Sequence, residues 1–227
     1  MRALRPHPHS RGFTLVELLV ALALLAVLAT ISWRGIDGMA RSIDHTRSYG
    51  SAVQTLQVGL AQWAADLDAV EAPLPTLAME WNGKALRLTR RDVGGQGWYV
   101  VAWTLRDTAQ GPRWLRWQSQ PVALTSELQR AWAQAALWGQ GQDATLQQRE
   151  TTVAPIESWQ IYFFRGNSWS NPQSSAGATN NANVSDANSG YATPDGVRLI
   201  LNLPADHPLA GRVTRDWVRP TLGGSQS

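Results

Sequence analysis

Cysteine is absent from this chain of 227 residues. Its absence excludes a disulfide framework, a thiol nucleophile and metal sites built on thiolates. Histidine is scarce as well, with four in the chain, and two of these, His7 and His9, lie close to the N-terminus. Neither His45 nor His207 has a metal-ligating residue at a suitable spacing. We therefore expect no metal site and no cofactor.

Catalytic motifs are also lacking. No serine stands in a Gly-x-Ser-x-Gly elbow. Asp66 and Asp68 are two residues apart within a predicted helix, so they project from different faces and make a poor acid–base pair. We expect a protein that is not an enzyme.

An excess of basic charge is confined to the N-terminus. The formal net charge is +3, but Arg2, Arg5 and Arg11 fall within the first twelve residues, which contain no acid. The rest of the chain then has 20 − 3 = 17 basic residues against 17 acidic ones. Nucleic-acid binding requires clustered basic charge, so we expect no nucleic-acid partner.

One long apolar run follows this basic segment. Phe13–Trp33 comprises 21 residues with a single charge, Glu17, and about 20 apolar residues suffice to span a bilayer. The positive-inside rule keeps the basic segment cytoplasmic and exports the remainder. A charge at the centre of a membrane helix costs about 2.5–3.5 kcal/mol on insertion scales, so Glu17 indicates a function.

The string Arg11-Gly12-Phe13-Thr14-Leu15-Val16-Glu17 resembles the processing site of the type IV prepilin and pseudopilin family. The resemblance implies cleavage between Gly12 and Phe13 by a dedicated prepilin peptidase, and methylation of the new Phe13 amine. Glu17 would then be the fifth mature residue. Its implied role is assembly, through pairing with the Phe13 amine of a neighbouring subunit, which offsets the burial of both charges.

Two simpler interpretations were weighed. A secretory signal has an apolar core of about 7–15 residues and a small-residue cleavage site at its far end. Ala26–Ala29 offers such a site, but the run is too long and Glu17 is out of place in it. A plain single-span anchor fits the length and leaves the seven-residue string unexplained.

Helical periodicity continues beyond the apolar run. Gly35 and Gly38, each costing about 1 kcal/mol in a helix interior, are expected to soften or kink the helix. Apolar residues then recur at spacings of three and four, as on one helix face: Val53, Leu56, Leu60, Trp63, Leu67 and Val70. We expect this later stripe to pack on the protein's own head, residues 36–43 to lie against neighbouring subunits, and Pro73 to end the helix.

Beyond Pro75 the pattern changes from helix to strand. Ala85–Arg90 alternates with period two, and Trp98–Arg106 is rich in aromatic and β-branched residues. We predict strands at 74–79, 85–90, 98–106, 114–117, 157–164 and 197–203, a hairpin from the third and fourth of these, a short surface helix at 126–137, and an edge strand from 214 followed by a frayed tail. The fold class is α+β, a long N-terminal helix packed on an antiparallel β-sheet head, as in pilins.

Four segments follow from these patterns: a cleaved cytoplasmic leader at 1–12, a transmembrane helix at 13–33, its periplasmic extension at 34–72, and a head at 73–227. Within the head, 166–196 is poor in aliphatic residues and is expected to be a mobile loop. Asp186–Gly190 is faintly similar to the start of a calcium loop. An EF-hand needs a glutamate at the twelfth position, which here is Val197, so we expect no calcium site.

Twelve tryptophans are an unusual load. Burial in a β-rich core is the preferred explanation for most of them, because tryptophan buries a large area. Exposed tryptophans would instead stack on glycans or contact other proteins. Trp132 and Trp138, on the predicted surface helix, are expected to be the most exposed.

A finer resemblance, to the J-type minor pseudopilins of type II secretion, is carried by four further stretches: Arg34–Met39, Leu60–Leu67 with Asp66, Trp114–Trp117, and Gly196–Leu201. The absence of cysteine favours a pseudopilin over a pilin, because many pilins have a disulfide in the head. The tryptophan load and the loop at 166–196 depart from the family's pattern.

What this resemblance implies is a structural subunit at the tip of a periplasmic pseudopilus, which initiates assembly and supports protein export. The implied partners are the I-, K- and H-type minor pseudopilins, the prepilin peptidase, the inner-membrane secretion platform and secreted substrates. The implied location is the inner membrane of a Gram-negative bacterium, with one span and a periplasmic head. Two alternatives stay open: a minor pilin of a type IV pilus, and a membrane-tethered periplasmic glycan-binding module.

Overall fold

The structure is a computed structural model that describes residues 13–73, 77–92, 94–95, 97–173 and 193–220. The chain divides into two compact units, Met1–Gly50 and Ser51–Ser227. Helix α1, Leu15–Asp68, begins in the first unit and ends in the second. Helix α1 continues through Gly35 and Gly38. Among the described residues, α1 is the one helix long and apolar enough to cross a membrane.

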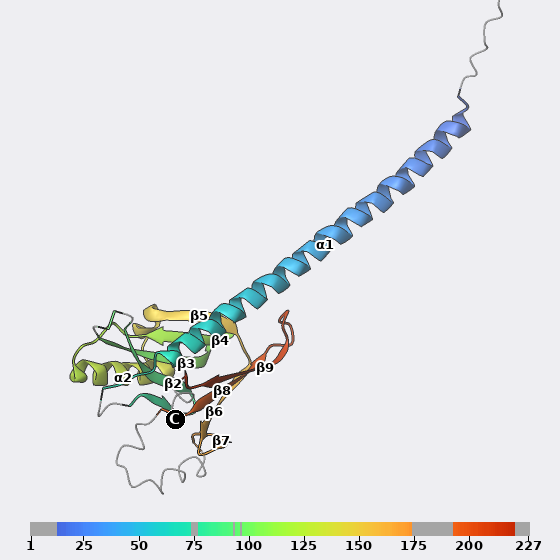
Figure 1. Ribbon diagram of the computed structural model, residues 1–227. Coiled ribbons are helices and arrows are strands. Elements are labelled where there is room, and N and C mark those ends of the chain that lie inside the picture. The colour runs from blue at the N-terminus through green and yellow to red at the C-terminus, as the bar shows by residue number, and fades with distance from the viewer. Residues whose placement is uncertain (1–12, 74–76, 93, 96, 174–192, 221–227) are drawn as a thin grey trace, which may run out of the picture. The chain divides into compact units, whose positions relative to one another are not determined.

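The second unit contains two antiparallel sheets (Figure 1), and the sequence analysis had predicted an antiparallel β-sheet head without giving a number of sheets. The five-stranded sheet has the order β1-β2-β3-β4-β5, with β1 Met79–Trp81, β2 Ala85–Arg91, β3 Trp98–Thr108, β4 Gly111–Gln118 and β5 Glu150–Pro155. The four-stranded sheet has the order β7-β6-β8-β9, with β6 Ser158–Arg165, β7 Ser168–Ser170, β8 Gly196–Leu203 and β9 Gly211–Val218. The α+β class is confirmed.

Strand periodicity divides the side chains of the five-stranded sheet between two cores. Val101 and Trp103 of β3 point into a cluster shared with the end of α1 and with the four-stranded sheet. Val100 and Ala102 point to the opposite face, against helix α2, Thr125–Gly139. Because successive residues of a strand face opposite sides, one strand supplies both cores. The five-stranded sheet is therefore a middle layer, with α2 on one face and α1 and the second sheet on the other.

The apolar stripe of α1 packs on the head as predicted. Leu56, Trp63 and Leu67 are buried in the shared core, and Leu60 and Val70 are partly buried against it. The helix ends at Asp68, before Pro73, which had been expected to end it, and Val70 then forms an isolated bridge with Arg90 of β2.

The expectation that Trp132 and Trp138 are exposed was wrong. Their exposed fractions are 9% and 0%. Helix α2 is amphipathic, and its apolar face packs on the sheet. Figure 1 shows the helix beside this sheet. Trp132 Nε1 donates a hydrogen bond to Thr89 Oγ1 at 2.8 Å, so the polar end of this indole is satisfied inside the interface.

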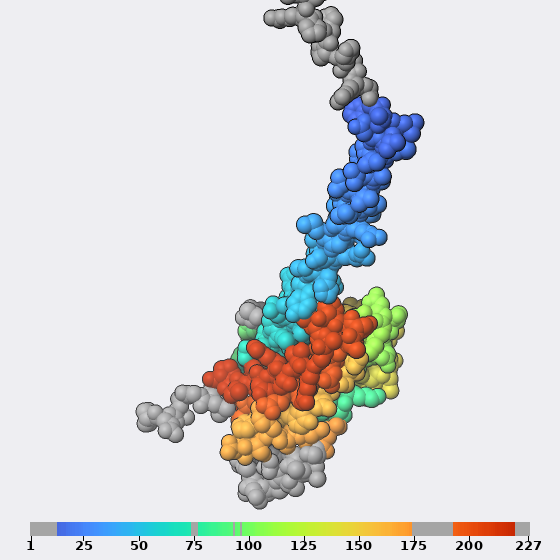
Figure 2. Space-filling model, turned by 90° about the vertical axis from the view of Figure 1, so that its right-hand side faces the viewer, coloured from blue at the N-terminus to red at the C-terminus, as the bar shows by residue number. Residues whose placement is uncertain are grey.

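Several other segments differ from the prediction. The strand expected at 74–79 begins at Met79, residues 74–76 lying outside the described residues. Strands β5 and β7 were not predicted, and β7 falls within the segment expected to be a loop. The rest of that loop from 174 to 192, including Asp186, also lies outside the described residues. Strand β9 forms a sheet edge as predicted, and its red surface is visible in Figure 2.

Candidate functional site

The start of α1 is organised by Thr14 and Glu17. The Thr14 backbone N–H and its hydroxyl each lie 3.1 Å from Glu17 Oε2, and the Glu17 backbone N–H donates to Thr14 Oγ1 at 3.3 Å. This is a capping box, in which two otherwise unpaired N–H groups at a helix N-terminus are satisfied reciprocally. Phe13 is exposed directly before it, and Gly12 lies outside the described residues.

The capping box gives Glu17 a role within its own chain that the sequence analysis missed. The Thr-x-x-Glu spacing before an apolar run was the signal that predicts it. The interaction fixes the carboxylate at the first turn of α1, where the helix dipole favours a negative charge. The acid therefore has a defined axial position, which a pairing with another chain would require.

The N-terminal half of α1 presents apolar side chains to its surroundings on all sides. The large exposed hydrophobic residues from Phe13, which directly precedes α1, to Ile43 are Phe13, Leu15, Val16, Leu18, Leu19, Val20, Leu22, Leu24, Leu25, Val27, Leu28, Ile31, Trp33, Ile36, Met39 and Ile43. A soluble monomer rarely exposes so large a contiguous apolar surface, which marks contact with a membrane or with other proteins.

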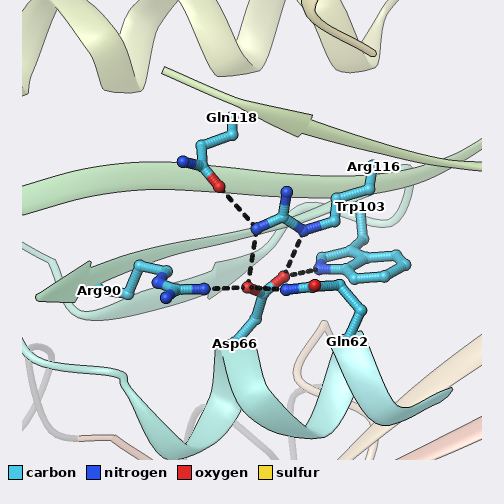
Figure 3. A network of polar contacts seen from close by, with 6 residues as sticks. All are labelled: Gln62, Asp66, Arg90, Trp103, Arg116 and Gln118. Carbon is cyan, nitrogen blue, oxygen red and sulfur yellow. Dashed lines mark hydrogen bonds and ion pairs between the residues drawn. The ribbon is translucent and has the colours of Figure 1, made fainter. Parts of the chain in front are cut away.

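At the other end of α1, Asp66 is the centre of a buried polar network (Figure 3). Its side chain is fully buried and accepts hydrogen bonds from Arg90 of β2 at 2.6 Å and from Trp103 Nε1 of β3 at 3.0 Å. Arg116 of β4 binds both carboxylate oxygens, with Nε–Oδ2 at 2.7 Å and Nη2–Oδ1 at 2.8 Å. Gln62, one turn earlier on α1, donates to Asp66 Oδ1 at 3.0 Å.

This network, which we call the Asp66 hub (Gln62, Asp66, Arg90, Trp103 and Arg116), joins the helix to three adjacent strands. A buried carboxylate is tolerated only when it is paired and hydrogen-bonded, and Asp66 is paired with two arginines and accepts further hydrogen bonds from Gln62 and Trp103. The hub therefore fixes the rotation of α1 against the five-stranded sheet.

Asp68 makes a separate connection to the second sheet. Trp217 Nε1 of β9 donates to Asp68 Oδ1 at 2.7 Å. The two aspartates thus lie on different faces of α1, as their spacing predicted, and each anchors the helix to a different sheet. No group of three or more His, Asp or Glu side chains in the described part of the chain is placed to hold a metal ion.

A groove of about 440 Å³ runs between α1 and β5. Its lining comes from α1, from strand β5 and from one residue of β4: Gln54, Thr55, Val58, Gly59 and Gln62; Thr151, Thr152 and Val153; and Arg116. The groove thus touches the Asp66 hub at Gln62 and Arg116.

Comparison with known proteins places the N-terminus in a recognised class. Residues 7–33 match the prokaryotic N-terminal methylation motif. Type II secretion system protein J of Klebsiella pneumoniae is 39% identical to this chain over 61 residues, 27% of this chain and 31% of that protein. The chain therefore matches less than a third of this relative's length.

These matches, with the fold, confirm the resemblance to the type IV prepilin and pseudopilin superfamily. They support a pilin-like or pseudopilin role and fit a membrane-anchored protein with a periplasmic head. Within the superfamily, the matched segment is similar to protein J of type II secretion.

Proposed function

We propose that this chain is a minor pseudopilin of the type II secretion system, a structural subunit of the pseudopilus tip that initiates assembly and supports protein export across the outer membrane. The observation that carries the proposal is a methylation motif at the start of a helix whose apolar N-terminal half is exposed and whose last turns are anchored in a β-rich head. We assign it no catalytic reaction.

In this proposal the precursor is cut between Gly12 and Phe13 by the prepilin peptidase, and the Phe13 amine is methylated. Residues 1–12 are the cytoplasmic leader, 13–33 the span in the inner membrane, 34–72 the periplasmic extension and 73–227 the head. The apolar span is retained after cleavage, because the cut precedes it.

Glu17 would pair with the positively charged Phe13 amine of a neighbouring subunit. In a low-dielectric bundle an isolated carboxylate is costly, and an ammonium partner offsets that cost. The capping box places the Glu17 carboxylate one turn from its own Phe13, so the pairing would set the axial register between subunits.

The partners we propose are the I-, K- and H-type minor pseudopilins at the tip, the inner-membrane platform and the secreted substrates. Identity to protein J over 61 residues supports this choice over a minor pilin of a type IV pilus. The glycan-binding alternative has lost its main support, because Trp132 and Trp138 are buried.

The test uses three variants of the full chain. Glu17→Gln removes the charge but keeps a side chain that can complete the capping box, and Glu17→Ala removes both. Thr14→Ala weakens the cap but keeps the charge. If the charge drives assembly, both Glu17 variants are processed normally but fail to restore secretion in a strain lacking this chain, whereas Thr14→Ala restores it. Full secretion with Glu17→Gln would refute the pairing.

The processing site is tested separately. Gly12→Ala should accumulate uncut precursor, visible as a larger species on a gel, whereas Ser10→Ala in the same leader should mature normally. Normal maturation of Gly12→Ala would refute the assigned bond. Co-purification with I- and K-type subunits supports the secretion tip, and capture by pilus minor pilins instead would assign the chain to a type IV pilus.

A further inference from the structure

The groove between α1 and β5 has one charged residue in its lining, Arg116, which belongs to a cluster with an excess of positive charge. Arg90 and Arg116 share the single carboxylate of Asp66, so the three groups carry a net charge of +1. Their side chains are 15%, 13% and 0% exposed, which limits neutralisation by solvent. Arg116 Nη2 also donates to the neutral Gln118 Oε1 at 2.8 Å, which satisfies a hydrogen bond but adds no negative charge.

The walls of the groove are apolar or neutral. Val58 is 63% exposed, and Val153 and Gly59 lie beside it. The remaining lining residues apart from Arg116 are glutamine or threonine, and none is acidic. Arg116 has to share its carboxylate partner Asp66 with Arg90, so a second carboxylate in the groove would balance the charge of the cluster. The apolar wall beside Arg116 is complementary to aliphatic side chains that flank such a carboxylate.

The outer side of the groove is open to another chain. Strand β5 is the last strand of the five-stranded sheet, and Thr151 and Thr152 are exposed on it. Edge strands present unpaired backbone groups, which a protein segment can contact in addition to side chains. The α1 wall, from residue 54 to 62, offers about two helical turns of contact.

We propose that this groove binds a segment of a neighbouring subunit that carries an aspartate or glutamate between aliphatic side chains, with the carboxylate pairing with Arg116. The class of partner rests on the proposed function. The charge and apolar character of the segment rest on the groove alone.

The experiment uses the full chain in its own cells, with the photo-crosslinking residue p-benzoyl-phenylalanine at position 58 in the groove. The control position is Leu137, which is 43% exposed on α2, the helix that covers the opposite face of the sheet. Cross-linked peptides are sequenced by mass spectrometry.

A charge-matched pair of variants tests the electrostatic part. Thr151 is the cross-strand neighbour of Arg116, so Thr151→Glu would neutralise the groove from within, whereas Thr151→Gln has nearly the same size and no charge. Gln54→Glu is a second such variant, for which the natural Gln54 is the neutral control. Circular dichroism and protease resistance check that each variant folds.

The proposal predicts that position 58 cross-links to a segment of a membrane-anchored subunit in which an aspartate or glutamate lies between aliphatic residues. The cross-linking yield should fall about tenfold with Thr151→Glu or Gln54→Glu. Thr151→Gln should have little effect on the yield. Three results would each overturn the proposal. They are equal cross-linking yields in the Glu and Gln variants, equal capture of the same peptide from position 137, and cross-linking only to soluble exported proteins. If deleting the chain leaves secretion intact, the proposed function fails, and the charge dependence of the cross-link still tests the groove.

Discussion

Arg116 of β4 binds the carboxylate of Asp66 of α1 through two parallel hydrogen bonds, Nε to Oδ2 at 2.7 Å and Nη2 to Oδ1 at 2.8 Å. Fifty positions separate the two residues in the sequence. The bidentate geometry is directional as well as strong, so it holds the helix in one rotational setting on the sheet. The same arginine forms part of the groove floor, which links the anchoring of α1 to the surface proposed to bind a partner.

Asp66→Asn should destabilise the head strongly. Removing one charge of a buried pair leaves the others uncompensated and typically costs about 3–5 kcal/mol. Urea unfolding of the full chain in detergent, followed by tryptophan fluorescence, measures the change. Asp37→Asn is the control, because Asp37 forms an exposed pair with Arg41 on the same helix, worth about 0.5 kcal/mol or less. Equal effects of the two variants would contradict an anchoring role for the Asp66 hub.

Gly59 is required for the close contact between α1 and β5. A Cβ atom at this position would lie 2.3 Å from Val153 Cγ1, which forces a displacement. In Gly59→Ala the overpacking should therefore lower the free energy of unfolding by about 1–3 kcal/mol. The higher helix propensity of alanine should offset about 1 kcal/mol of this loss. Gly50→Ala, with open space around its Cβ, should be stabilising by the propensity alone.

A double variant checks the cause of that cost. Val153→Ala removes the clashing methyl groups, so Gly59→Ala should be tolerated better in its presence than alone. Additive effects in the double-mutant cycle would show that the clash is not the source of the destabilisation.

Trp138→Phe should lower the melting temperature of the head. Trp138 Nε1 donates to Glu150 Oε2 at 2.8 Å, and the same carboxylate pairs with Arg106. Losing a buried hydrogen bond to a charged group costs about 1.5–3 kcal/mol. Trp33→Phe, at a 74% exposed position, is the control and should leave the transition unchanged. Equal shifts in thermal unfolding would contradict the buried placement of Trp138.

The pair of Arg198 and Asp216 joins β8 to β9 across the sheet edge, with bonds of 2.7 and 2.6 Å. The hydrogen bond from Arg198 holds the pKa of Asp216 below its ordinary value, as does the nearby positive charge, while burial opposes them. A lowered pKa in the folded state means that the pair stabilises fully above the unfolded pKa of about 3.9, and that this contribution is lost as pH falls through the lowered value.

Asp216→Asn should therefore reduce stability by a constant amount between about pH 5 and 7, and the difference from the natural chain should shrink below about pH 4. The loss of stability is small because both side chains of the pair are partly exposed. Urea unfolding across this pH range measures it. A difference that grows on acidification would contradict the assignment, and Glu157→Gln, an exposed change on the loop before β6, is the control.

Local patterns were sufficient for most of the secondary structure. The period-two segment at 85–90 became β2, the aromatic segment at 98–106 became β3, and its partner β4 formed the predicted hairpin. Strand β5 was missed, because Glu150–Pro155 is short, ends in a proline and has no clean alternation of apolar and polar residues. It forms a strand because β4 offers it a free edge, and edge strands tolerate proline.

The candidate functional site was also predicted only in part. Glu17 was singled out because one carboxylate in an apolar run of membrane length is conspicuous in any sequence. Asp66 was noted as half of a poor acid–base pair and as part of the stretch Leu60–Leu67 that carries the J-type resemblance, and no structural role was predicted for it. Its partners Arg90 and Arg116 lie 24 and 50 positions away, and no local pattern brings them together.

The sequence by itself determined the class of the protein, the start and apolar character of α1 and the α+β composition of the head, because these depend on residue types within a few turns of one another. The tertiary structure alone decided that the strands form two sheets, that Trp132 and Trp138 are buried, and that Arg116, which shares the carboxylate of Asp66 with Arg90, lines a groove without acidic lining residues. The physical reason is that burial and net local charge are properties of residues distant in the chain, which become neighbours only when the layers pack.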